Sequence, residues 1–133
     1  MLADEDTRRQ IQALIEATYE ALSTPGSDVG ELFGTDDIAI AGSGQGELWT
    51  GREPAVAAAG AVASLGFRWS PDTVTVWRHG DVAWAQILGS VIVGSDGADK
   101  PVPYWTTGVF RLESDRWRWV YWGGSEPQES PKV

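Results

Sequence analysis

Acidic side chains are the residues of this chain that could act as a general base. Glu47 follows the glycine-rich residues 42–46 (GSGQG) and lies two residues before Trp49. An indole next to a carboxylate can shield it from water and raise its pKa toward the range in which a base works. The sequence therefore makes Glu47 the first candidate for a catalytic base. An ion pair with Arg52 is the structural alternative.

Two adjacent carboxylates and a single histidine are the other titratable candidates. Asp36 and Asp37 would point to opposite sides of a strand, and Asp37 is the second candidate for a base. Capping or solvent-exposed carboxylates are the alternative. His79 precedes Gly80, so an exposed position at a turn is expected for it. With no cysteine and one histidine, we expect no metal site and no other cofactor.

Aromatic residues give a second signal, since the chain holds eight Trp and three Tyr. Flat apolar side chains with one hydrogen-bonding group suit the wall of a site for a planar or polycyclic organic molecule, although an aromatic core is the alternative. If the site is catalytic, the hydroxyl of Tyr19 or Tyr121 would stabilise a developing oxyanion. The residues expected to line the pocket are Tyr19, Trp49, Trp69, Tyr104, Trp119 and Tyr121.

A β-hairpin near the end of the chain must position most of these rings. Residues 104–112 and 117–123 are rich in Val, Thr, Phe, Tyr and Trp, and a polar turn joins them. Regular pairing from the turn would place Phe110 opposite Trp119 and Gly108 opposite Tyr121. Both faces would then carry large apolar groups. We therefore expect helices on one face and a partner or ligand on the other.

The face turned away from the pocket is the predicted dimer surface. Regular pairing places Val109, Val120 and Trp122 on this face, where burial across a two-fold axis would explain why they are not polar. Arg111 and Arg118 should lie opposite each other on the same face. Two like charges there need acidic neighbours or solvent.

The remaining elements predict an α+β fold. Apolar residues recur at three- and four-residue steps in the first helix, and an alanine-rich stretch indicates the second. The expected order is helix 4–22, a helical turn at 28–33 capped by Ser27, strand 38–41, helix 54–64, loop 68–71, strands 74–77 and 82–93, loop 94–100 and the hairpin. We expect one domain, residues 1–133, in which helices lie on one face of a curved antiparallel sheet.

Charge and hydropathy exclude several functional classes. The net charge is −9 and only ten Lys and Arg are spread along the chain, which argues against nucleic-acid binding. No secretory pattern and no apolar run long enough to span a bilayer is visible, so we expect a cytoplasmic protein that does not bind membranes.

Several segments together resemble the SnoaL-like branch of the nuclear transport factor 2-like superfamily. They are the long first helix, the Asp36-Asp37 step, residues 47–53 (ELWTGRE) before an alanine-rich helix, residues 80–84 (GDVAW), and an ending with Trp117, Arg118, Val120 and Ser125. The resemblance implies a cystatin-like cone, in which a curved sheet wraps around helices and leaves a deep pocket. It also implies a homodimer packed through the outer face of the sheet.

The resemblance departs from the family where catalysis is concerned. Many relatives place a His two residues before the final Ser, and this chain has Gly123 there. We therefore expect a domain that binds a small hydrophobic or aromatic molecule and is catalytically weak or non-enzymatic. One alternative is an isomerase, cyclase or hydratase acting on a polyketide- or steroid-like substrate. The other is a dimeric interaction module with a filled core.

Overall fold

The computed structural model describes residues 1–93 and 100–128, and the predicted loop at 94–100 lies almost wholly outside this part of the chain. The six strands described form one sheet in the order β2-β1-β6-β5-β4-β3. Strand β1 runs parallel to β6, and the other neighbours are antiparallel. The elements are α1 (Glu5–Leu22), the 3-10 turn η1 (Gly30–Leu32), β1 (Ala39–Ala41), β2 (Leu48–Thr50), α2 (Arg52–Ser64), β3 (Arg68–His79), β4 (Val82–Val93), β5 (Lys100–Glu113) and β6 (Arg116–Ser125).

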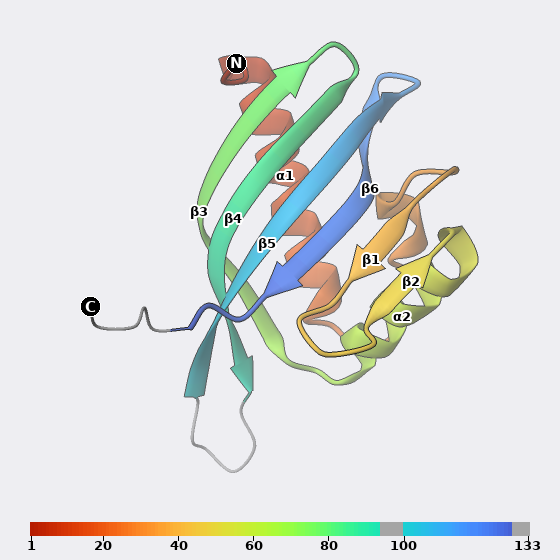
Figure 1. Ribbon diagram of the computed structural model, residues 1–133, viewed down its shortest axis with the longest axis vertical. Coiled ribbons are helices and arrows are strands. Elements are labelled where there is room, and N and C mark those ends of the chain that lie inside the picture. Colours follow the sequence, from red (N-terminus) through yellow and green to blue (C-terminus); the bar gives the residue numbers. More distant parts are fainter. Residues whose placement is uncertain (94–99, 129–133) are drawn as a thin grey trace.

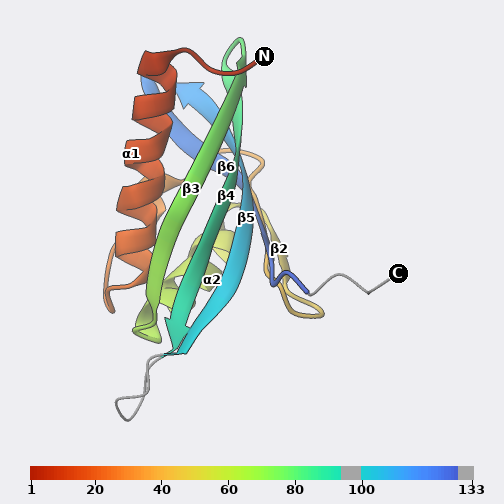
Figure 2. The ribbon, with the colours of Figure 1, turned by 90° about the vertical axis from the view of Figure 1, so that its left-hand side faces the viewer.

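The helices lie on one face of a strongly curved sheet, as Figures 1 and 2 show. Helix α1 runs along the concave side and contacts β3, β6 and α2, whereas α2 lies beside the short β1–β2 hairpin. In the described part of the chain, no helix covers the opposite face (Figure 2). This arrangement confirms the predicted α+β cystatin-like cone.

Helix α1 forms where its apolar periodicity predicts it. The Asp4 carboxylate accepts a hydrogen bond of 2.7 Å from the Thr7 amide and so caps the first turn. Ile11 and Ile15 share the fully buried face. The helix ends at Leu22, three residues before Pro25. Its inward face supplies much of the core against which the sheet curls.

The buried face of helix α2 consists of alanine, which allows the helix to pack closely against its neighbours. Its buried residues are Ala55, Ala58, Ala59 and Ala63. Side chains this small allow the helix backbone to approach the β1–β2 hairpin and α1. The helix begins at Arg52, two residues before the predicted start at Pro54.

Three sequence-based expectations about local structure are wrong. Strand β2 was not predicted, because three residues after a glycine-rich turn give little pattern to detect. The predicted loop at 68–71 is the start of β3, in which a bulge between Pro71 and Thr73 accommodates the proline. Ser27 does not cap the turn at 28–33, since η1 follows Val29 without a side-chain cap.

A β-bulge also shifts the register of the C-terminal hairpin. Next to the turn, Phe110 pairs with Trp119 as predicted. The register then slips between Val109 and Phe110, so that Val109 pairs with Tyr121, and Gly108 pairs with Trp122 instead of Tyr121. The extra residue on β6 exchanges the two faces of the strand beyond it.

Candidate functional site

A cavity of about 290 Å³ opens at the end of the molecule where α2 lies. Its walls come from α2, the β1–β2 hairpin and the neighbouring ends of β3, β4, β5 and β6, which Figure 1 shows gathered in this region. Most of the lining is apolar. The lining residues are Leu22, Ile40, Gly42, Ser43, Glu47, Trp49, Ala58, Ala59, Val62, Leu65, Phe67, Trp69, Val91, Val93, Val102, Tyr104, Trp122 and Glu126.

Strand register gathers aromatic rings along one wall of the cavity. Ile40 pairs with Trp49 on one side and with Trp122 on the other, so these three side chains form a row across β2, β1 and β6. The Trp69 ring stands nearly perpendicular to Tyr104, with centroids 4.9 Å apart, and to Trp122 at 5.9 Å. Edge-to-face packing of this kind holds the rings in fixed orientations.

Trp69 also carries an unpartnered polar atom. Its indole nitrogen Nε1 is buried and has no hydrogen-bond partner among the described residues. A buried N–H without an acceptor costs stability unless a water or another molecule supplies one. This donor belongs to a ring that lines the cavity.

The Tyr104 hydroxyl is the most enclosed ionisable group of the lining. Burial raises the pKa of Tyr104 above its ordinary value, and the nearby carboxylates of Glu47 and Glu126 add to that shift. Hydrogen bonds with Trp122 and Ser43 oppose the shift. The phenol is therefore neutral near pH 7 and available as a hydrogen-bonding group.

Gly124 makes room for that phenol. A Cβ atom at position 124 would lie 1.8 Å from the Tyr104 hydroxyl oxygen, so a side chain there is incompatible with the ring as placed. Gly124 pairs with the fully buried Thr106 and faces inward. The Tyr104 hydroxyl thus occupies the space that a side chain at position 124 would need.

Glu47 lies at the mouth of the cavity with an exposed side chain. Its Oε1 atom accepts a hydrogen bond of 2.5 Å from the Gly44 amide, which closes the turn between β1 and β2. The Ser43 hydroxyl in the same turn donates to Oε2 of Glu126 at 3.1 Å. The expectation that Trp49 shields Glu47 from water is wrong, because Trp49 lines the wall while the carboxylate faces solvent.

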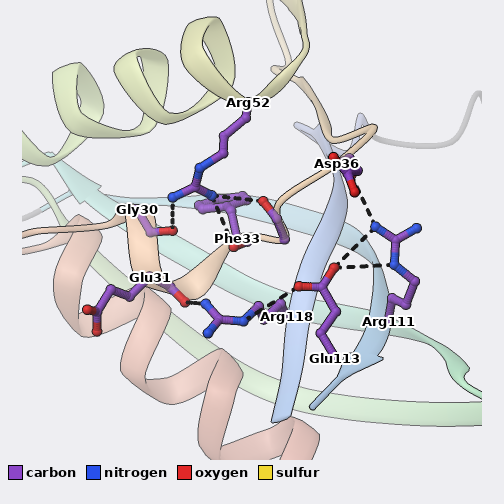
Figure 3. Close-up of polar contacts among 9 residues, drawn as sticks. Gly30, Glu31, Phe33, Asp36, Arg52, Arg111, Glu113 and Arg118 are labelled. Carbon is purple, nitrogen blue, oxygen red and sulfur yellow. Dashed lines mark hydrogen bonds and ion pairs between the residues drawn. The ribbon is translucent and has the colours of Figure 1, made fainter. Parts of the chain in front are cut away.

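Arg52 binds backbone carbonyls (Figure 3), and not Glu47, the partner that the structural alternative gave it. Its Nη1 donates to the carbonyls of Phe33 and Gly34 at 3.1 and 2.8 Å, and its Nη2 donates to that of Gly30 at 2.9 Å. These bonds attach the start of α2 to residues 30–34. They fix the position of the helix whose other end lines the cavity.

The predicted opposition of Arg111 and Arg118 is present at the tip of the hairpin. Glu113 lies between them, 3.2 Å from Arg111 Nη2 and 3.7 Å from Arg118 Nε (Figure 3). Arg118 also donates to the carbonyl of Glu31, and Arg111 donates to that of Asp36 at 3.2 Å. The two like charges are therefore compensated within the chain.

Two residues expected in the pocket are buried deeper in the core and do not line the cavity. The Tyr19 hydroxyl donates to Thr106 Oγ1 at 2.9 Å, and burial raises the pKa of Tyr19. The Trp119 ring is fully buried, and its Nε1 donates to Thr18 Oγ1 at 2.8 Å. Both rings touch Trp122 and so support the cavity wall from behind.

The other candidate acid–base residues lie on turns away from the cavity. Asp37 adopts a positive φ of 50° in the turn before β1 and is exposed. His79 is exposed at the end of β3. Neither side chain belongs to the cavity lining.

The bulge reverses the predicted positions of Tyr121 and Trp122. Trp122 is buried and lines the cavity, so its expected place on the outer face is wrong. Tyr121 pairs with Val109, which in turn pairs with Trp84, so Tyr121 faces outward and not into the pocket. Val120 is the residue that the bulge leaves without a partner.

Comparison with known proteins agrees with this geometry. The profile of the SnoaL-like domain matches residues 11–129. The chain belongs to this family. No curated protein matches this SnoaL-like domain.

Solved structures share the fold of the SnoaL-like domain at low sequence identity. A protein from Streptomyces avermitilis, named as a proposed dehydratase of the nuclear transport factor 2-like family, superposes with a TM-score of 0.80 at 18% identity, covering 95% of this chain and 100% of that one. A nuclear transport factor 2-like protein with a cystatin-like fold from Novosphingobium aromaticivorans gives 0.77 at 22% identity, covering 92% and 83%. At these identities the likeness establishes the fold alone.

Gly123, the position at which the resemblance places a His in relatives, does not face the cavity in this SnoaL-like domain. It pairs with the exposed Thr107, and a Cβ there would meet the Tyr121 ring at 2.7 Å on the outer face. The inward position is Gly124. The space expected beside Gly123 is thus covered by Tyr121, while the inner space at Gly124 is filled by Tyr104.

Much of the cavity lining of the SnoaL-like domain was missed by sequence reasoning. Val62 comes from α2, Leu65 directly follows that helix, Val91 comes from β4 and Val102 from β5. Ordinary core packing explains such residues equally well, so their types give no separate signal. Glu126 follows the last strand, so its position at the mouth of the cavity depends on how the whole sheet folds.

Two structural features bear on metals and membranes. Within residues 1–93 and 100–128, no group of three or more His, Cys, Asp or Glu side chains is placed to hold a metal ion. Neither helix in the described part of the chain combines the length and the apolar character needed to cross a bilayer.

Proposed function

We propose that this SnoaL-like domain binds a small hydrophobic or aromatic molecule in the cavity and catalyses a reaction weakly or not at all. The observation that carries the proposal is an aromatic-walled cavity of about 290 Å³ whose lining is mainly apolar. Ligand pockets usually span about 300 to 1,000 Å³, so the size favours a compact ligand. Trp49, Trp69 and Trp122 offer flat surfaces for it, and Tyr104 offers a hydroxyl.

The weak-catalysis part of the proposal rests on the ionisable groups. Among the described lining residues these are Tyr104, Glu47 and Glu126. Both carboxylates are exposed, and Glu47 is already bonded to the Gly44 amide. A general base must reach the proton that it removes inside the site. A solvent-facing carboxylate at the mouth is poorly placed for that task.

An isomerase, cyclase or hydratase remains the second candidate because one observation favours it. Tyr104 and Glu47 line the same cavity, so a hydrogen-bond donor and a carboxylate could act on one substrate. The fold shared with the proposed dehydratase from Streptomyces avermitilis is in keeping with this reading. Loss of turnover in Glu47→Gln with unchanged ligand affinity would establish the enzymatic role. Full turnover retained in Glu47→Gln would remove Glu47 from that role.

Filling the cavity tests the binding proposal. Val62 lines the cavity from α2, whereas its neighbour Ala61 is exposed and lies outside the lining. Val62→Trp should abolish binding of a neutral bicyclic probe, naphthylmethanol, measured by isothermal titration calorimetry. Ala61→Trp adds the same side chain to the solvent face and should leave the affinity unchanged. Equal affinities in both variants would place the probe elsewhere and overturn the proposal.

We also propose that the domain forms a homodimer through the outer face of the sheet. Val109, Tyr121 and Trp84 are neighbours on that face by strand register, and each is half-buried. Trp105 lies on the same face with 41% of its surface exposed. Apolar groups in such number on one uncovered face are typical of an interface. The interaction-module alternative would share this dimer but would not bind the probe.

The solution mass tests the dimer. Light scattering at micromolar concentration should give twice the chain mass for the wild type and a single chain mass for Val109→Lys. Thr24→Lys, an exposed position after α1, is the matched control and should remain dimeric. A monomeric wild type would contradict the proposed interface.

A further inference from the structure

We infer that the cavity selects a hydrophobic amine, bound with its apolar body against the indoles and its ammonium group at the mouth. The inference rests on the proposed function and adds the charge of the ligand to it. Glu47 and Glu126 both line the cavity and both are exposed. They come from two segments far apart in the sequence, one just before β2 and one just after β6.

One turn holds both carboxylates at the mouth. Gly44 donates its amide to Glu47 Oε1 at 2.5 Å, and the adjacent Ser43 donates its hydroxyl to Glu126 Oε2 at 3.1 Å. Each carboxylate uses one oxygen in these bonds, which leaves the other oxygen able to accept from a ligand. The electrostatic effect of both groups reaches the Tyr104 hydroxyl, which is part of the cavity wall.

No cation of the described lining offsets this negative charge, since the lining contains no Lys, Arg or His. Three arginines of the chain are engaged elsewhere. Arg52 is held by three backbone carbonyls, and Arg111 and Arg118 share Glu113. Arg68 and Lys100, which begin β3 and β5, lie outside the lining. The chain as a whole carries a net charge of −9.

These charges discriminate between ligands of the same shape. A ligand carboxylate would be repelled by Glu47 and Glu126 and would find no basic partner in the lining. An ammonium group would be attracted by both carboxylates, and the indole rings of Trp49 and Trp122, which line the same cavity, can add cation–π attraction. A neutral ligand should fall between the two.

Three probes of one shape test the inference: naphthylmethylamine, naphthylmethanol and naphthoate. Titration calorimetry at low salt should show the amine binding more tightly than the alcohol by about tenfold, since exposed ion pairs and cation–π contacts each contribute modestly. Naphthoate should bind more weakly than the alcohol. The preference should shrink as salt is added.

Removing the two charges should remove the preference. The double variant Glu47→Gln, Glu126→Gln should bind the amine and the alcohol within about twofold of each other, because the attraction it loses is electrostatic. Glu16→Gln, Glu20→Gln, which changes the net charge equally on the exposed side of α1, should keep the full preference.

The outcomes separate this inference from the function on which it rests. If the alcohol binds and the amine binds no better, the charge selection is overturned while the hydrophobic site stands. If the preference survives in the Glu47→Gln, Glu126→Gln variant, the mouth carboxylates do not cause it and the inference fails. If none of the three probes binds, the proposed function itself fails.

Discussion

Replacing Thr18 with valine should lower the stability of the fold, because it removes a hydrogen bond between α1 and the sheet. Thr18 is fully buried, and its Oγ1 accepts the indole N–H of Trp119 at 2.8 Å while donating to the Leu14 carbonyl at 2.7 Å. Valine has nearly the same shape but no hydroxyl. The substitution therefore leaves the Trp119 N–H buried without an acceptor, whereas the Leu14 carbonyl keeps its place in the helical hydrogen-bond ladder.

The expected cost follows from that orphaned donor. A buried polar group that loses its partner costs about 1 to 3 kcal/mol. For a domain of this size, each kcal/mol lowers Tm by about 3 to 5 °C, so Thr18→Val should melt about 3 to 15 °C below the wild type. Thr18→Ser keeps the hydroxyl and loses one buried methyl group, which costs about 1 kcal/mol.

Urea unfolding of a double-mutant cycle provides the assay. In the Trp119→Phe background there is no indole N–H to satisfy, so Thr18→Val should cost much less than in the wild type. The difference between the two backgrounds is the coupling energy, which we expect to be about 1 to 2 kcal/mol. Equal costs in both backgrounds would refute the reasoning, because the hydrogen bond would then contribute nothing.

Two further predictions concern glycine and tyrosine. Gly124→Ala should lower the free energy of unfolding by about 1 to 3 kcal/mol, because its Cβ would overlap the Tyr104 hydroxyl. Gly60→Ala, inside α2 with open space around its Cβ, is the control and should raise the free energy of unfolding by about 0.5 to 1 kcal/mol. A Gly124→Ala protein as stable as the wild type in urea would contradict the placement of Tyr104. Burial raises the pKa of Tyr19 above its ordinary value of 10.0, so the unfolded chain loses this proton first and stability should fall as pH rises above about 10. Tyr19→Phe should make that fall shallower in urea titrations between about pH 8 and 11, with Tyr104 contributing the rest, whereas an unchanged slope would show that the Tyr19 phenol is not protected.

The sequence predicts the hairpin because its signals are local. Residues suited to strands flank a polar turn, and close to that turn the pairing of Leu112 with Trp117 and of Phe110 with Trp119 follows from counting. The same local reasoning predicts α1 from its apolar periodicity. Each of these features depends on residues near one another in the chain.

The bulge at Val120 is not predictable in this way. It is stabilised by contacts made elsewhere in the sheet, since Trp122 then pairs with Ile40 of β1 and packs on Tyr19 of α1. One extra residue on β6 reverses which rings face inward. The predicted hairpin therefore has the correct pairing next to its turn but places Tyr121 and Trp122 on the wrong faces.

The cavity could be predicted only in its general character. Aromatic residues indicate an apolar site, and the structure brings Trp49, Trp69 and Tyr104 together around it. Its size depends on how closely the alanine face of α2 approaches the sheet, which is set by Arg52 and three distant carbonyls. Glu47 and Glu126 likewise line the same cavity although they lie far apart in the sequence.

Ligand binding in the aromatic cavity can be tested most directly with the eight tryptophans as reporters of where a ligand binds. Each indole N–H gives its own NMR signal, and naphthylmethanol can be titrated into labelled protein. We expect the signals of Trp49, Trp69 and Trp122 to shift in a saturable way, while those of the outer-face residues Trp77, Trp84 and Trp105 do not shift. Shifts confined to the outer-face indoles, or no shift at any indole at the highest soluble concentration, would contradict this expectation.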